Sequence, residues 1–468
     1  MMMTRRSLIK RVGQAGLLLA ASLAMAGQTN ARKRDARPVL VIGAGAAGLA
    51  AARYLMDGGQ VVTVLEARSR PGGRVHTAYD MAAHPVELGA EFIHGDRVLT
   101  WDWVRQARLV TVGSQIDSEQ NSFIYYGGQL RLYADMEGLP DLSILEIDTT
   151  DLDVETLLHR PDTATAPEDM PFGALVDQHY PALSAEARRL YDQVISSEYG
   201  AGIDQLGVAG LAEATYDNDG EGNFRIVEGY SRLIDAMARG LDIRYQQVVT
   251  RIAYGAEGVQ VTTEDGQQYD GAAVVVTLPL AVLQAGAVEF SPPLPQATQA
   301  AIDGLGSGKV NKLILRFDRA FWPAAMEGVS TSGDSQFWWR PGWGRPNETP
   351  TLTALMGGAA GERYSAMSQD EAIAAGLADL TEIFKRDDLA ERLVSGRFVN
   401  WGADPFSLMG YSHVPVGAAG LREVLAQPVA NVLHFAGEAT HPLRPATVHG
   451  ALESGIRAAT LVRHVPSV

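Results

Sequence analysis

The sequence predicts an α/β fold in which a dinucleotide-binding βαβ unit is combined with an inserted second domain. An apolar segment at 39–42 leads into the glycine-spaced run Gly43-Ala-Gly45-Ala-Ala-Gly48, and a second apolar segment, 61–65, ends at Glu66. This order predicts a strand, a glycine turn, a helix and a second strand that ends in an acid. The continuous apolar run 272–277 is typical of a further buried parallel strand.

Each part of the βαβ unit has a physical reason. Gly43 allows a sharp turn, Gly45 leaves room for a pyrophosphate, and Gly48 lets the helix pack closely on the strand. The N–H groups at the start of the helix face the phosphates. Glu66 is expected to bind the ribose hydroxyls. A purely structural glycine turn is the alternative, and it does not explain the acid at the expected distance.

Further elements follow from apolar patterning. We expect strands near 242–245, 258–263, 272–277, 312–317, 351–355 and 432–435, and helices at 370–384 and from about 447. The predicted nucleotide domain consists of residues 38–95, 226–285 and 395–468. The predicted substrate-binding domain, with a mixed sheet and helices, consists of residues 96–225 and 286–394.

The N-terminal segment resembles an export signal. Thr4-Arg5-Arg6-Ser7-Leu8-Ile9-Lys10 is a twin-arginine pattern, and the short apolar stretch behind it ends in Ala24-Met25-Ala26. We therefore expect residues 1–26 to be removed after export to the periplasm or outside the cell, with the twin-arginine machinery as partner, and 27–37 to be a flexible lead. An uncleaved anchor is the alternative. No stable membrane insertion is expected, because no other apolar run approaches the roughly 20 residues of a membrane span.

Composition excludes several classes of protein. The 468 residues are 46% hydrophobic, which is enough for a large core, and the net charge of −16 makes nucleic acid an unexpected partner. The same negative field attracts cationic substrates such as amines, although ordinary solubility explains it equally well. The absence of cysteine excludes disulfides, thiolate metal sites and any cysteinyl cofactor link. No metal-ligand spacing stands out.

A second phosphate-binding motif follows Glu66. In Ala67-Arg68-Ser-Arg70-Pro-Gly72-Gly73-Arg74, a glycine pair is flanked by arginines, whose planar forks suit phosphate oxygens. A surface turn with solvated arginines is the alternative interpretation. The position directly behind the βαβ unit favours a cofactor contact.

Together with three later motifs, this pattern resembles the flavin-dependent amine oxidase family, which holds monoamine oxidases, polyamine oxidases and histone lysine demethylases. These motifs are Glu87-Leu-Gly-Ala-Glu91, Phe435-Ala-Gly-Glu438 and Thr447-Val-His-Gly-Ala-Leu-Glu-Ser-Gly455. The likeness is greatest to the polyamine oxidase and demethylase branch. It implies a Rossmann-like domain that binds FAD in an extended pose, with the isoalloxazine at the junction of the two domains. Gly410 stands where monoamine oxidases carry the flavin-linking cysteine, so noncovalent FAD is implied.

The resemblance implies a cofactor site drawn from distant segments of the chain. Val249 matches the position whose backbone contacts adenine, and Thr447 and Val448 open a helix whose N-terminal end faces the flavin. The implied FAD-binding residues are Gly43, Gly45, Ala46, Gly48, Glu66, Ala67, Arg68, Gly72, Gly73, Arg74, Leu88, Gly89, Ala90, Glu91, Val249, Trp401, Gly437, Glu438, Thr447, Val448 and Ala451.

The resemblance implies a catalytic set of Lys312, Tyr411 and Thr447. Lys312 matches the family lysine that holds a water beside flavin N5. A lysine inside an apolar strand is also a functional candidate by itself, because burial without a partner is costly, although a solvated strand-end lysine is the alternative. Tyr411 resembles one wall of an aromatic cage that orients an amine. Thr447 takes the place of the second tyrosine of monoamine oxidases.

Substrate contacts are implied for residues near the expected cage. The set is Glu91, His94, Glu198, Phe406 and Tyr411, with Asp217, Asp219 and Glu221 in a segment that resembles an acidic cavity wall. A structural histidine at His94 and a solvated acidic loop at 217–221 are the alternatives. His449 is left unassigned.

The implied activity is FAD-dependent oxidative deamination of a primary or secondary amine, including polyamines. A hydride passes to flavin N5, the imine is hydrolysed to an aldehyde or ketone, and the reduced flavin is reoxidised by O2 to H2O2 or by a periplasmic electron carrier. An L-amino-acid oxidase is the alternative enzyme, and an exported flavin-binding protein is the alternative without enzymatic activity.

Overall fold

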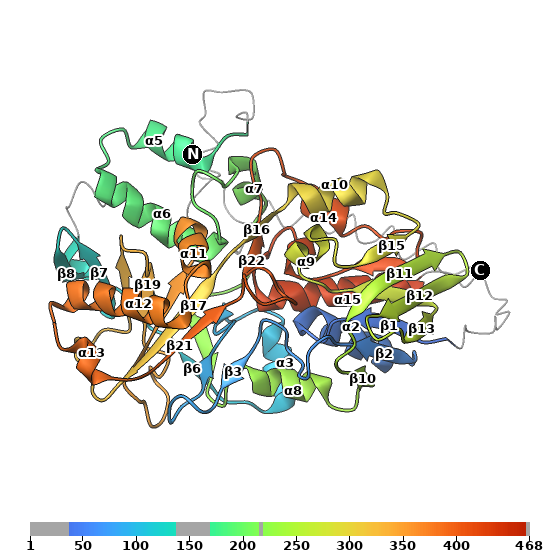
Figure 1. Cartoon of the computed structure of the whole chain (residues 1–468), viewed down its shortest axis with the longest axis horizontal. Helices are drawn as coiled ribbons and strands as arrows, with labels where there is room; N and C mark the ends of the chain where they lie inside the picture. Colours follow the sequence, from blue (N-terminus) through green and yellow to red (C-terminus); the bar gives the residue numbers. More distant parts are fainter. Residues whose placement is uncertain (1–36, 137–168, 215–218, 465–468) are drawn as a thin grey trace, which may run out of the picture. The chain divides into compact units, whose positions relative to one another are not determined.

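The structure is a computed structural model that describes residues 37–136, 169–214 and 219–464 (Figure 1). The expected signal at 1–26, the lead up to residue 36 and Asp217 lie outside the described residues. Contacts join residues 37–465 into one unit, so the predicted limits between the two domains stay a prediction.

A five-stranded parallel sheet carries the βαβ unit. Its strands are β1 (Val39–Ile42), β2 (Val62–Leu65), β10 (Ile243–Arg244), β14 (Ala273–Val276) and β23 (Leu433–Phe435), in the order β10-β2-β1-β14-β23. Each neighbouring pair is parallel. Helix α2 (Ala46–Asp57) connects β1 to β2, which confirms the predicted α/β class with a Rossmann-like unit.

The C-terminal helix α15 (Val448–His464) packs against α2, although about 400 residues separate them in sequence (Figure 1). Small residues permit the contact: a Cβ atom at Gly455 would lie 2.1 Å from the carbonyl oxygen of Ala47. Gly48 fits as closely against the turn, where a Cβ would lie 1.9 Å from the carbonyl oxygen of Gly43. The first and last segments of the described chain therefore share one core.

A seven-stranded mixed sheet forms the second large layer. In sheet order its strands are β21 (Leu393–Asn400), β17 (Asn311–Phe317), β20 (Thr351–Met356), β19 (Phe337–Trp339), β18 (Gly328–Thr331), β7 (Ser122–Tyr126) and β8 (Gln129–Leu132). Only β18 and β7 run parallel in this sheet. Helix α12 (Gln369–Phe384) packs on it through a buried cluster with Leu313 and Trp338 and starts with a capping box of Ser368 and Glu371.

Smaller sheets and helices complete the described chain. The sheets are β13 (Gln268–Gly271), β12 (Gly258–Thr263), β11 (Val249–Gly255) and β15 (Glu289–Ser291); β5 (Ile93–His94), β9 (Asn223–Ile226) and β6 (Thr111–Gly113); β16 (Gly306–Gly308) with β22 (Tyr411–His413); and β3 (Thr77–Ala78) with β4 (Val86–Glu87). The helices are α3 (Thr100–Ala107), α5 (Phe172–His179), α6 (Ala185–Tyr199), α7 (Val208–Glu213), α8 (Ser231–Ala238), α9 (Leu280–Gln284), α10 (Gln296–Gly304), α11 (Gly358–Ser365), α13 (Leu389–Arg392) and α14 (Leu421–Leu425), with 3-10 turns at Tyr133–Met136 and Glu438–Thr440.

Most of the patterned segments fold as expected. The predicted strand 258–263 coincides with β12, and the predicted helix 370–384 is α12 with one more residue at its start. Strands β7, β8, β18 and β19 were not predicted, because segments this short carry too little periodicity to identify a strand.

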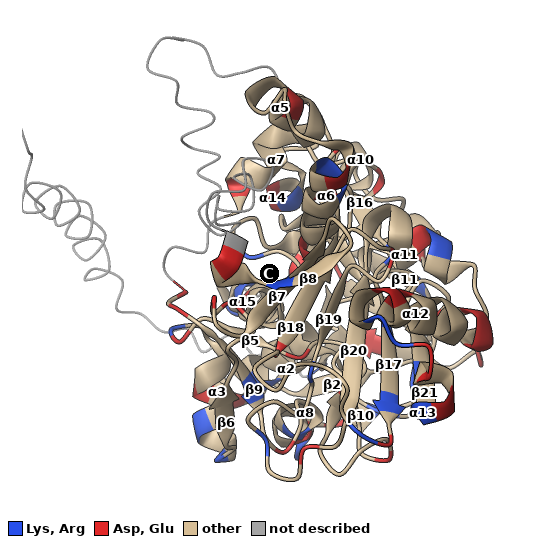
Figure 2. Ribbon diagram, turned by 90° about the vertical axis from the view of Figure 1, so that its left-hand side faces the viewer, with Lys and Arg blue, Asp and Glu red and all other residues tan. Residues whose placement is uncertain are grey.

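Positively and negatively charged residues are interspersed along outer helices, for example α6 and α11 (Figure 2). Of the helices in the described part of the chain, none is both long and apolar enough to cross a bilayer.

Candidate active site

The first part of the site is a cradle at the carboxyl ends of β1 and β2. Gly43 has a positive φ of 100°, which turns the chain sharply, and Gly45 is the residue that precedes α2. The carboxylate of Glu66 accepts hydrogen bonds from the N–H groups of Ala44, at 2.7 Å, and Arg68, at 2.8 Å. Burial raises the pKa of Glu66, and these two hydrogen bonds oppose the rise.

The cradle has the space that FAD requires. A Cβ atom at Gly45 would meet no protein atom within 4 Å, and the same holds at Gly437. Open space in front of a helix N-terminus fits a pyrophosphate. The N–H groups of Gln246 and Gln247 donate to the carbonyl oxygens of Arg68 and Glu66, which places the segment leading to Val249 beside the cradle. The residues present therefore fit FAD.

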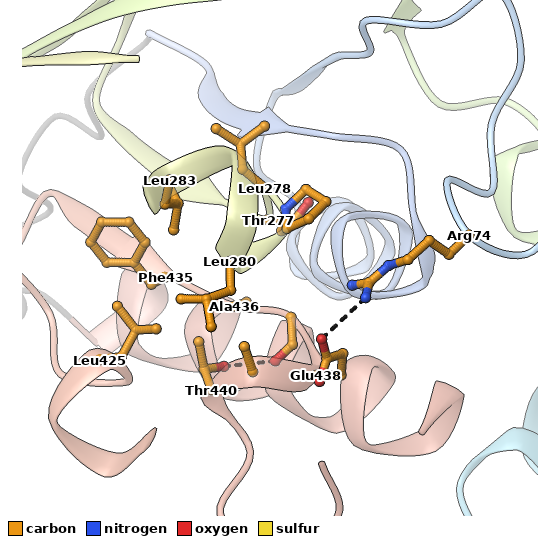
Figure 3. A pocket seen from close by; sticks show the side chains of 13 residues that line it. Arg74, Thr277, Leu278, Leu280, Leu283, Leu425, Phe435, Ala436, Glu438 and Thr440 are labelled. Carbon is orange, nitrogen blue, oxygen red and sulfur yellow. Dashed lines mark hydrogen bonds and ion pairs between the residues drawn. The ribbon is translucent and has the colours of Figure 1, made fainter. Parts of the chain in front are cut away.

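A small pocket lies where β14 and β23 end, and its lining includes Arg74, Thr277 and Glu438 (Figure 3). Figure 3 shows the guanidinium of Arg74 directed at the carboxylate of Glu438, and the Nη1–Oε1 distance is 3.2 Å. Glu438 also accepts hydrogen bonds from the hydroxyl of Ser412, at 2.6 Å, and the N–H of Ala446, at 3.0 Å. Burial alone would raise the pKa of Glu438, but the positive charges of Arg74 and Arg422 outweigh burial and lower it.

The other two arginines of the second motif bind protein groups. Arg68 forms a bidentate ion pair with Asp404, with N–O distances of 2.7 and 2.9 Å, and its guanidinium lies 5.3 Å from the centre of the Phe406 ring. Arg70 donates to the carbonyl oxygens of Pro71 and Gly73, both at 3.0 Å, and so shapes the glycine pair. The phosphate contact of Arg68 and the substrate contact of Phe406 stay predictions.

Residues 86–91 connect the cradle to Lys312. Gly89 passes so close to Arg74 that a Cβ would lie 1.7 Å from the Arg74 carbonyl oxygen, and the indole N–H of Trp401 donates to the carbonyl of Leu88 at 3.0 Å. Lys312 Nζ donates to the carbonyl of Glu87 at 3.3 Å. The structure therefore brings the implied cofactor residues of this loop, Trp401 and Lys312 together.

Lys312 is buried, as its apolar strand predicted. Only 7% of its side chain is exposed, Nζ lies 3.1 Å from Oε2 of Glu91, and Nζ lies 5.0 Å from the centre of the Trp339 ring. The Oε1 atom of Glu91 accepts from Arg225 Nε at 2.8 Å and from the indole N–H of Trp339 at 2.9 Å. Glu91 was expected to contact substrate and cofactor, and the structure places its carboxylate on Lys312 and Arg225.

Sequence reasoning missed three residues around Lys312. Arg225 lies on β9, Trp339 on β19, and Glu327 accepts from Arg225 Nη1 at 2.7 Å. Arg225 and Glu327 are fully buried. The sequence held no local signal for Arg225, because it alternates with Phe224 and Ile226 in a short strand and this pattern is typical of a solvent-facing position.

Tyr411 and Thr447 make contacts within the protein. The Tyr411 hydroxyl donates to the carbonyl of Ser197, next to the exposed Glu198 on α6, and burial followed by the charge of Glu198 raises the pKa of Tyr411. The Thr447 hydroxyl accepts from the N–H of Gly450 and donates to the carbonyl of Arg444, both at 3.0 Å, so it caps α15. Their catalytic roles stay predictions.

The acidic residues implied for the cavity wall and the two nearby histidines differ in burial and in partners. Asp219 is buried, is paired with Arg444, and lies 3.2 Å from Nε2 of His449, whose pKa falls to about 3 through burial. His94 is exposed, and its Nδ1 lies 2.6 Å from the side-chain oxygen of Asn223. Glu221 is exposed. His449 is thus a neutral histidine beside a carboxylate.

Comparison with known proteins decides the family. Residues 46–463 match the family described as flavin containing amine oxidoreductase. The chain belongs to this family. The protein is therefore a flavin-dependent amine oxidoreductase with FAD as its cofactor, and a chain without cysteine cannot hold FAD through a cysteinyl link.

Two relatives and one solved structure describe the position of this amine oxidoreductase in its family. It is 34% identical to polyamine oxidase 4 of Oryza sativa subsp. japonica over 90% of its own length and 87% of the relative. It is 32% identical to lysine-specific histone demethylase 1 homolog 3 of Arabidopsis thaliana over 92% of its own length, but spans only 30% of that protein. Cyclohexylamine oxidase from Brevibacterium oxydans has the same fold, with a TM-score of 0.77, 20% identity, and coverage of 91% of this chain and 98% of that one.

The open space at Gly45 yields a test of the cradle. Gly45→Val adds a side chain whose Cβ meets no protein atom within 4 Å, so we expect the apoprotein to melt at an unchanged temperature. The affinity for FAD should fall at least tenfold, about 1.4 kcal/mol, because the side chain occupies the pyrophosphate position. Gly255→Ala, at another open glycine, is the control. Equal FAD affinity in the Gly45 variant would contradict the assignment of the cradle.

The buried carboxyl group of Glu87 yields a pH-dependent test. Burial raises its pKa from 4.5 to about 7, although Thr77, Arg345 and the N–H of Tyr230 oppose the rise. The neutral carboxyl group contributes about 3 kcal/mol to the free energy of unfolding at a pH below its unfolded-state pKa. This contribution is lost as the pH rises to about 7. Glu87→Gln should reduce the loss of melting temperature of the holoprotein between about pH 5 and pH 8. An unchanged pH dependence would exclude titration of Glu87 in this range.

Proposed function

We propose that this protein catalyses the oxidative deamination of an amine, with polyamines as its substrate class. The cradle at Gly45 and Glu66 would hold FAD, which would supply an acceptor for the hydride of the amine α-carbon and a donor of two electrons to O2, which with two protons gives H2O2. The imine product reacts with water to give an aldehyde or ketone and a smaller amine or ammonia. A periplasmic electron carrier is the alternative acceptor.

The observation that carries the proposal is the buried ammonium group of Lys312 beside the cofactor loop. Nζ donates to the carbonyl of Glu87 and lies over the ring of Trp339, in a member of an amine oxidoreductase family. A positive charge fixed in a site of low polarity stabilises negative charge that develops when O2 is reduced. We assign Lys312 this role.

Other residues exclude water and orient the amine. Trp401 is buried and anchored on Leu88, and the ring of Tyr411 packs on Gly200. An aromatic, largely dry wall favours the neutral amine, which is the form that can give up a hydride. The start of α15, capped by Thr447, would contribute its positive end to the stabilisation of negative charge on the bound cofactor.

The buried cations argue against an amino-acid substrate. A substrate carboxylate requires a cation, but Arg225 is paired with Glu91 and Glu327, and Arg345 donates to the carbonyl oxygens of Pro341 and Ile226. The relative named polyamine oxidase 4, of which the chain spans 87%, supports an amine with more than one nitrogen. The exposed carboxylate of Glu198, beside the contact of Tyr411, is a suitable anchor for a distal ammonium group.

Anaerobic reduction of the bound flavin tests the function. We expect spermidine or a diamine to bleach the roughly 450 nm band of the holoprotein faster than monoamines do, because a second ammonium group adds a charged contact. Bleaching only by amino acids would replace the proposal with an L-amino-acid oxidase. The absence of bleaching by every amine would contradict amine oxidation.

The location is a separate proposal, supported by the twin-arginine pattern at Arg5 and Arg6. We expect the wild-type chain in the periplasmic fraction and the variant with both arginines changed to lysine in the cytoplasm. Export of the variant at the wild-type level would contradict the signal.

A further inference from the structure

Lys312 is held by one carboxylate. Its Nζ donates to Oε2 of Glu91 at 3.1 Å and to the backbone carbonyl of Glu87 at 3.3 Å. The exposed fractions of the two side chains are 7% for Lys312 and 2% for Glu91. An ammonium group at this depth depends on its counter-charge, because water contributes little to its solvation.

Protein donors occupy three of the roughly four acceptor sites of the Glu91 carboxylate. Oε1 accepts from Arg225 and Trp339, and Oε2 accepts from Lys312. Burial would raise the pKa of Glu91, but the charges of Lys312 and Arg225 outweigh it and hold the pKa at about 2. The carboxylate is therefore ionised throughout the working pH range, and its geometry is fixed from three sides.

The second carboxylate of the cluster has a different neighbour. Glu327 accepts from Arg225 Nη1 at 2.7 Å, from the Ser114 hydroxyl at 2.6 Å and from the N–H of Gln115 at 2.6 Å. It thus contacts the same arginine as Glu91 but has no hydrogen bond to Lys312. Two buried cations face two buried carboxylates, and only one of the carboxylates reaches the lysine.

We propose that Glu91 is a positioning residue for the redox reaction, which aims Lys312 Nζ and keeps it protonated, and that it is not the anchor for the substrate amine. This inference rests on the role of Lys312 in the proposed function. Without the negative charge of Glu91, the buried ammonium group of Lys312 loses its counter-charge, and an opposite charge at hydrogen-bond distance is what favours the charged form. The charged and titratable groups that face this pair are His84, Glu87, Arg225, Glu327 and Arg345.

The proton on Lys312 is measurable directly. The chain has only five lysines, Lys10, Lys33, Lys309, Lys312 and Lys385, so a holoprotein labelled with ¹⁵N-lysine gives few Nζ signals, and Lys312→Met identifies the one required. In Glu91→Gln, we expect the titration midpoint of this signal to move to lower pH by at least one unit. Glu327→Gln is the matched control and should leave the midpoint closer to the wild-type value. Lys309, paired with the exposed Glu362, serves as an internal reference.

Flavin reoxidation provides the functional readout. The holoprotein is reduced by light without any amine and mixed with O2 over a range of pH. In Glu91→Gln, the pH at which the reoxidation rate falls on the alkaline side should shift in the same direction as the titration midpoint of the Lys312 signal. When Glu91→Gln is added to the Lys312→Met variant, the reoxidation rate should not change further. Because no amine is involved, this experiment tests the role of Glu91 independently of the substrate. If the protein oxidised no amine, that finding would refute the proposed substrate class but not the role of Glu91.

Three outcomes would overturn the proposal: an unmoved Lys312 titration, additive effects of the two substitutions, or a raised KM for the amine with an unchanged pH profile. The last would make Glu91 the substrate anchor. Glu91→Asp retains the charge but withdraws it by one methylene group, and its midpoint should move in the same direction by less. If Glu91→Gln does not fold, an unmoved midpoint in Glu91→Asp overturns the proposal.

Discussion

The burial of the Lys312 ammonium group is the constraint on which the rest of this site depends. Its counter-charge comes from Glu91, which follows β4 in the chain. Arg225 on β9 and Glu327, which precedes β18, complete the cluster. Removal of one partner from a buried ion cluster costs about 3–5 kcal/mol, because a charge remains without compensation. Segments from three sheets therefore meet at one point, and the cofactor loop 86–91 is fixed there.

Close backbone contacts at glycine residues hold the cofactor cradle in place. Gly48 packs on the turn at Gly43, and Gly455, in the middle of α15, packs on Ala47 at the start of α2, so the two helices share one core with the parallel sheet. Two helix N-termini then offer positive ends to an elongated anionic cofactor. Gly89 against Arg74 and Trp401 against Leu88 connect this cradle to the charge cluster. The cofactor cradle and the buried cation thus belong to one continuous set of contacts.

Local patterns in the sequence were sufficient for the parts of the fold that have local causes. The βαβ unit, β12 and α12 follow from glycine spacing and apolar patterning, and Lys312 stood out as a charge in an apolar strand. Partners could not be predicted in the same way. Glu91 and Arg225 are 134 positions apart, and Arg68 and Asp404 are 336 apart, so no local pattern records either pair. The sequence suggested that Arg68 and Glu91 belong to the site, but not which charge each of them meets.

A crystal structure of the holoprotein with a bound diamine tests the central claim most directly. The account predicts FAD extended from the cradle at Gly45 to the region of Lys312, with flavin N5 within reach of Nζ directly or through one water, and with the diamine away from Glu91. A flavin ring remote from Lys312, or a substrate nitrogen bonded to the Glu91 carboxylate, would contradict it.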